Sequence, residues 1–60
     1  MLTPEQKYAL ARISYVIDST IDVLQIIDKS LGTSTNSHQF ILSSSLTELL
    51  NVFEEKENEN

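Results

Sequence analysis

The sequence predicts an all-α protein: an antiparallel two-helix hairpin that dimerises into a four-helix bundle. Three observations support this prediction. Apolar residues recur at spacings of three and four along two segments, a polar turn containing the one glycine separates these segments, and the chain has only 60 residues. The apolar residues do not alternate in twos, as they would in a half-buried strand. We expect one hairpin over residues 1–53 and an acidic, frayed tail over residues 54–60.

The first helix is predicted to span approximately residues 4–31. Thr3 is a good N-cap, Pro4 suits the first helical position, and Gln6 completes a Thr-x-x-Gln capping box. Gly32 is the residue type that ends helices in the left-handed conformation. These signals define both ends of the helix.

An apolar seam runs along this first helix. Its spacing, kept for about three heptads, places one row of side chains on a single face. Ala9, Val16 and Val23 widen the seam into an arc that is broader than one partner helix covers. The members of the seam are Leu10, Ile13, Ile17, Thr20, Leu24, Ile27 and Leu31.

The turn is predicted over residues 32–36 and is short enough to make the two helices antiparallel neighbours. Asn36 and Gln39 repeat the capping arrangement, with Thr35 as an alternative cap one position earlier. The second helix follows over residues of about 37–55. Its apolar face holds Leu42, Leu46, Leu49 and Phe53, flanked by Phe40, Ile41, Leu50 and Val52.

The length of the chain favours self-association. A chain of 60 residues hides only about 60% of its unfolded surface, so a lone monomer is marginally stable. Disulfides are excluded because the chain has no cysteine, which leaves oligomerisation as the usual remedy. The alternative is a monomeric hairpin that folds only on a different protein. The predicted dimer core consists of Leu10, Ile13, Val16, Ile17, Val23, Leu24, Ile27, Leu42, Leu46, Leu49 and Phe53.

Charge and hydropathy restrict the class of partner. The formal net charge is −5, and the four basic residues are scattered, which disfavours nucleic acid. The acidic surface is compatible with docking on a basic protein patch, or with solubility alone. Charged residues, among them Arg12, Asp18, Asp22 and Asp28, interrupt the most apolar stretch, so we expect no membrane span. The N-terminal residues lack a secretory pattern, and we expect a cytoplasmic protein.

Tyr8, Arg12 and Tyr15 are the candidate partner-binding residues. Their spacings of four and three place them on one face of the first helix, and tyrosine and arginine often dominate interface energetics. The alternative is that the two tyrosine rings only flank the bundle core and keep their hydroxyl groups in water.

Residues that support catalysis or metal binding are sparse. His38 is the single histidine, and Asp18 with Asp22 forms the only carboxylate pair of interest on the first helix. Carboxylate metal sites in bundles add a Glu-x-x-His element, which is absent here. We therefore expect no catalytic residues, no cofactor and no metal. The predicted function is a small regulatory or interaction protein that homodimerises and binds another protein as an inhibitor or adaptor.

Two families provide alternatives. The long helix, short polar turn, second helix and acidic tail, with the opening Glu5-Gln6-Lys7 and Ala9-Leu10, resemble the plasmid-encoded Rop hairpin. That resemblance implies a four-helix-bundle dimer that binds paired RNA loops. Residues 43–50, Ser-Ser-Ser-Leu-Thr-Glu-Leu-Leu, are similar to the Ser-x-x-Leu-Asp signature of small hairpin phosphatases of response regulators in sporulating bacteria. Thr47 occupies the aspartate position of that signature, and Glu48 follows it.

Overall fold

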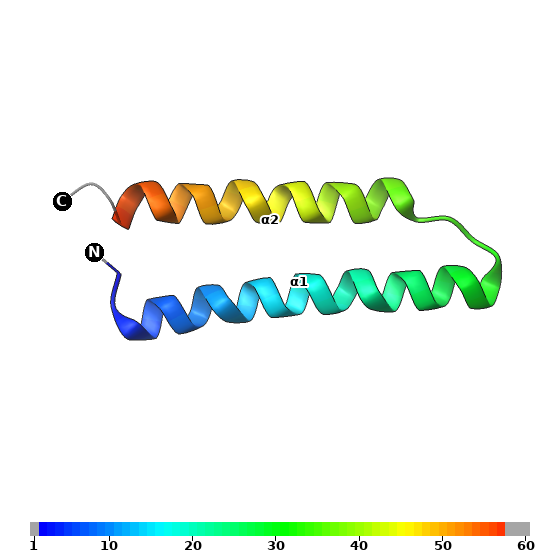
Figure 1. The fold of residues 1–60 in the computed structure, drawn as a ribbon, viewed down its shortest axis with the longest axis horizontal. Coiled ribbons are helices and arrows are strands. Elements are labelled where there is room, and N and C mark those ends of the chain that lie inside the picture. The colour runs from blue at the N-terminus through cyan, green and yellow to red at the C-terminus, as the bar shows by residue number, and fades with distance from the viewer. Residues whose placement is uncertain (1, 58–60) are drawn as a thin grey trace.

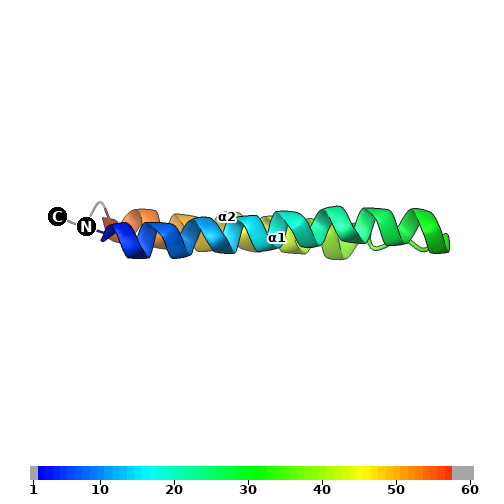
Figure 2. The ribbon, with the colours of Figure 1, turned by 90° about the horizontal axis from the view of Figure 1, so that it is seen from below.

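The computed structural model describes residues 2–57, except for the side chain of residue 57. The described residues form two helices, α1 (Pro4–Leu31) and α2 (Asn36–Glu57). The helices run antiparallel and side by side, and the short connection lies at one end (Figure 1). Viewed from the edge, the molecule is one helix thick (Figure 2), with extents of 49 × 19 × 7 Å. The prediction of an all-α hairpin is confirmed.

The ends of α1 are those that its sequence predicts. The backbone N–H of Gln6 donates to Thr3 Oγ1 at 3.1 Å, and the Thr3 backbone N–H donates to Gln6 Oε1 at 2.9 Å. These two bonds form the capping box and satisfy donors that have no partner inside the helix. At the other end Gly32 adopts φ 70° and ψ 25°, the left-handed conformation, and its N–H donates to the carbonyl of Asp28.

The start of α2 depends on Thr35. The backbone N–H of Gln39 donates to the Thr35 carbonyl at 2.9 Å, and the Gln39 side chain donates to Thr35 Oγ1 at 3.1 Å. Of the two predicted caps, Thr35 is therefore the residue that makes these bonds. At its other end α2 continues through the first part of the predicted tail to Glu57, and residues 58–60 lie outside the described residues.

The contact between the helices follows a line that differs in part from the predicted seam. Leu10, Ile17 and Leu24 belong to both, but Ile13, Ile27 and Leu31 of the seam are exposed. The half-buried positions that alternate at spacings of four and three, which we call the contact line, are Leu10, Ser14, Ile17, Ile21, Leu24 and Asp28 on α1. Their counterparts on α2 are Gln39, Leu42, Leu46, Leu50 and Phe53, of which Gln39 is fully buried.

The hairpin has little interior of its own. Among the described residues no apolar side chain is fully buried, and the only buried residue is Gln39, which is 9% exposed. Two helices in a single layer can cover one side of each other, whereas burial of an apolar side chain requires neighbours on several sides. The fold therefore leaves most of its apolar surface uncovered.

Candidate protein-interaction surfaces

One broad side of the hairpin is almost entirely apolar. On each helix, a row of residues lies next to the contact line and on the same side of it. We call this surface the apolar face; it contains Ala9, Ile13, Val16, Thr20, Val23 and Ile27 from α1 and Ile41, Ser45, Leu49 and Val52 from α2. None of these residues is charged, and the row on α2 is flanked by His38 before Ile41 and by Lys56 after Val52.

The two rows share one side because of helix geometry. Each residue of a row comes one position before a residue of the contact line, which turns it by about 100° in the same sense on both helices. Because the two right-handed helices are antiparallel, this rotation brings both rows to the same broad side of the hairpin. The opposite side is marked by a hydrogen bond of 3.4 Å from Gln25 to Gln39 across the two helices. This polar face carries Asp18, Asp22, Gln25 and Lys29 from α1 and Ser43, Thr47, Asn51 and Glu54 from α2, together with the apolar Ala11 and Phe40.

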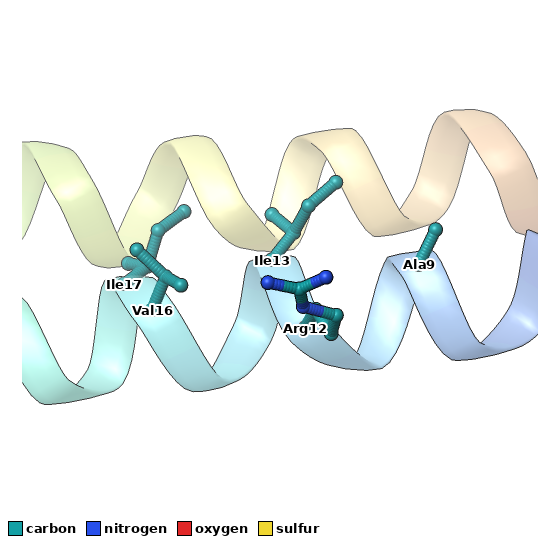
Figure 3. Close-up of a pocket in the computed structure, with 5 residues that line it drawn as sticks. All are labelled: Ala9, Arg12, Ile13, Val16 and Ile17. Atoms are coloured by element: carbon teal, nitrogen blue, oxygen red, sulfur yellow. The ribbon is translucent and has the colours of Figure 1, made fainter.

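The side chains of the apolar face are open to solvent. Val16 is 56% exposed and Val23 is 51% exposed, while Leu49 is 43% exposed. Shallow grooves run along the α1 part of the face. One of them is lined by Ala9, Arg12, Ile13, Val16 and Ile17 (Figure 3), and another by Tyr15, Val16, Ser19, Thr20, Val23 and Leu24.

The surface area of the chain is large for its mass. A compact protein of 6.8 kDa is expected to expose about 4,000 Å², because surface scales with mass in folded monomers. This chain exposes 4927 Å². The excess is on the order of the 800 Å² that each partner buries in a standard interface. A hairpin that is one helix thick, with neither broad side covered, accounts for this excess.

The predicted partner-binding residues lie on the outer edge of α1, away from α2. Tyr8 is 67% exposed and Tyr15 is 73% exposed, and both line an open groove with Ala11, Arg12 and Val16. Arg12 differs from the two tyrosines because it also lines the groove of the apolar face, where its side chain lies beside Ile13 (Figure 3). Arg12 thus borders the apolar face.

The eleven residues of the predicted dimer core fall into two groups. The first group lies on the contact line between α1 and α2: Leu10, Ile17, Leu24, Leu42, Leu46 and Phe53. The second group lies on the apolar face: Ile13, Val16, Val23, Ile27 and Leu49. The seam on α1 thus combines two adjacent rows, one used within the chain and one left open.

A cluster of polar residues near the connection was not predicted from the sequence. The Asp28 carboxylate accepts hydrogen bonds from the Thr33 hydroxyl at 2.8 Å, from the Thr35 backbone N–H at 3.0 Å and from the Thr35 hydroxyl at 2.8 Å. The Gln39 side chain also donates to it at 3.2 Å. Hydrogen bonds to the charged form, first from the Thr35 backbone and then from Thr33, lower the pKa of Asp28. The cluster holds the connection in one conformation.

Other candidate groups remain apart. His38 is exposed in the first turn of α2, and no three His, Asp or Glu side chains within the described residues come together in a group that could hold a metal ion. In the same part of the chain, neither helix has the length and apolar character that crossing a membrane requires. Comparison with known proteins found no matching family model, no matching curated protein and no matching solved structure.

Proposed function

We propose that this chain is a small non-catalytic interaction protein that homodimerises through its apolar face and binds another protein through the outer edge of α1. The observation that carries the proposal is the apolar face, a set of uncharged residues along one side of a hairpin that has no buried apolar side chain among its described residues. Face-to-face packing of two hairpins gives a four-helix bundle, in which such a row becomes the core.

Thr20, one of the two polar members of the apolar face, is compatible with burial. The Thr20 hydroxyl donates to the Val16 carbonyl of its own helix at 2.8 Å. A buried hydroxyl is costly only when its hydrogen-bonding capacity is unmet, and this bond already satisfies the donor. Each large apolar side chain that a partner covers contributes up to about 1.5 to 3 kcal/mol. The expected gain is therefore comparable with the whole stability of a small domain, about 5 kcal/mol or more.

Sedimentation equilibrium or light scattering at micromolar concentration tests the dimer. We expect twice the mass of the chain for the wild type and a monomer for Val16→Glu, because a charge would be buried in the bundle. Ala11→Glu, an equal change in charge on the side of α1 away from the apolar face, should remain a dimer. A folded wild-type monomer at these concentrations would refute the proposal.

The outer edge of α1 supports the second part of the proposal. Face-to-face packing leaves Tyr8 and Tyr15 uncovered, and exposed tyrosines are typical anchors of protein interfaces. We expect Tyr8→Ala with Tyr15→Ala to abolish retention of a host protein on the immobilised chain. Phe40→Ala removes an aromatic ring that is 72% exposed on α2 and should leave retention intact. Equal retention by both variants would exclude the tyrosine edge as the binding site.

A further inference from the structure

We propose that the two hairpins pack with their connections at the same end, so that α1 of each lies over α2 of its partner, and that Arg12 pairs with the partner's Glu48 and the partner's Glu55. This inference rests on the proposed function, since it specifies how the second copy sits on the apolar face. Charge complementarity along the rim of that face is the observation that carries it.

Two symmetric arrangements bring the apolar faces together. If the two-fold axis runs along the hairpin, α1 covers the partner's α2 and the connections meet at one end. If the axis runs across the hairpin in the plane of the interface, α1 covers the partner's α1 and the connections lie at opposite ends. Both arrangements bury the same side of the hairpin, so apolar area does not distinguish them. The charges at the rim do.

Glu5 lies on the rim of α1, seven positions before Arg12, and three further charged residues occupy the outer rims of the apolar face. Arg12 borders the face on α1, and Glu48 and Glu55 occupy the corresponding rotational positions on α2. All three are exposed, and within the described part of the chain none of them takes part in an ion pair. They are therefore available to a partner.

The contacts within the hairpin fix the levels of these residues along its axis. Phe53 shares a groove with Leu10, and Gln39 is bonded to Gln25. At the height of Arg12 along the hairpin axis, α2 has reached a point midway between Glu48 and Glu55. At a rise of 1.5 Å per residue, each glutamate is within about 6 Å of Arg12 along that axis. When the connections meet at one end, this level is preserved across the interface, and Arg12 faces both of the partner's carboxylates at once.

The opposite arrangement offers no such partner. In that arrangement α1 lies against the partner's α1, and the two helices run in opposite directions. Arg12 then faces three uncharged residues: the partner's Ser19, the partner's Val23 and the partner's Ile26. Flanking charge pairs are the usual means by which packed helices select orientation and register. The arrangement that pairs Arg12 is therefore favoured.

Distances between spin labels distinguish the two arrangements directly. The chain has no cysteine, so Ser34→Cys in the exposed connection provides one label per hairpin. We expect a distance below about 25 Å between the two labels, since packed helices lie about 8–10 Å apart. Opposite ends would separate the labels by roughly 40 Å, the length of α1 at 1.5 Å per residue. The long distance would overturn the inference while leaving the dimer intact, whereas absence of any dipolar coupling would overturn both.

A charge exchange tests the named pair. Arg12→Glu should weaken dimerisation about tenfold, because it replaces an attraction at two symmetric sites with repulsion. Adding Glu48→Arg should restore most of the affinity. The matched control is Arg12→Glu with Glu54→Arg, which has the same net charge but places the new arginine on the polar face, and it should remain weakened. Equal recovery in both double variants would show that only net charge matters and would refute the pairing.

Discussion

At the scale of single residues, Asp28 organises the connection between the helices. Its carboxylate joins the last turn of α1 to Thr35 and Gln39 at the start of α2, through bonds of 2.8 to 3.2 Å. Gln39, the only buried residue among those described, is in turn bonded to Gln25. Gln39 is the buried member of this cluster, and a buried polar group is costly unless it is paired, so its bonds to Asp28, Thr35 and Gln25 stabilise the hairpin.

This cluster predicts a pH dependence of stability. The folded-state pKa of Asp28 lies below the ordinary value of 3.8, so the stabilisation it contributes is fully present above that value and is lost as pH falls through the folded pKa. We expect the difference in unfolding free energy between wild type and Asp28→Asn to shrink below pH 4. Urea denaturation followed by circular dichroism at several pH values measures it.

The control for this pH dependence is Asp22→Asn, on the polar face. Asp22 takes no part in the cluster, so its replacement should leave the acid limb of the stability profile as it is in the wild type. If Asp28→Asn and the wild type lost stability in parallel below pH 4, the carboxylate would not be responsible for the effect.

The sequence does not reveal this cluster, and the reason is physical. Asp28 and Gln39 are polar residues with many exposed roles, and their roles here depend on the turn that brings them together across eleven positions. By contrast, the capping box and Gly32 act within a few residues of the chain. Local signals of that kind are readable before the fold is known.

At the scale of the elements, Gly32 determines where α1 ends. A Cβ added at this position would meet no atom within 4 Å beyond its two chain neighbours, so the cost of substitution is that of the left-handed backbone. We expect Gly32→Ala to lower the unfolding free energy by about 1 kcal/mol. Gly32→Asn should cost less, since asparagine tolerates this conformation better. Equal losses in chemical denaturation would contradict this explanation.

The contact line between the helices gives a second prediction at this scale. Ile21 is half-buried on that line, whereas Ile26 is 64% exposed on the outer edge of α1. Ile21→Ala should therefore destabilise the protein by about 1 to 2 kcal/mol, and Ile26→Ala by less than about 0.5 kcal/mol. Urea midpoints of the two variants provide the comparison. A larger effect at Ile26 would place α2, or a second copy, against the other side of α1.

The sequence predicts the helices better than it predicts their facing sides. The ends of α1 agree with the prediction because each has its own local signal. The apolar arc, however, spans two adjacent rows, and the spacing of three and four fits either row. Ile17 and Ile13 therefore look alike in the sequence, although the first contacts α2 and the second lies on the apolar face. Only the position of α2 separates them.

At the scale of the whole molecule, folding and association are expected to be coupled. Among the described residues, the apolar side chains of the hairpin are all at least partly exposed, so in the proposed dimer most of their burial comes from the second copy. Stabilisation by a binding partner grows with the logarithm of its concentration. The stability of this protein should therefore depend on how much of it is present.

Thermal unfolding at several concentrations tests this coupling. We expect the melting temperature of the wild type to rise steadily as the protein concentration increases from about 1 to 100 μM. A binding partner present at a hundred times its dissociation constant raises the free energy of unfolding by about 2.7 kcal/mol. Val23→Asp should melt lower and lose the concentration dependence, since a charge on the apolar face opposes packing. Ala11→Asp lies on the side of α1 away from that face, and its melting temperature should still rise with protein concentration. A wild-type melting temperature that is constant over this range, with full helix content, would mean that one copy is stable alone, and the apolar face would then need a different occupant.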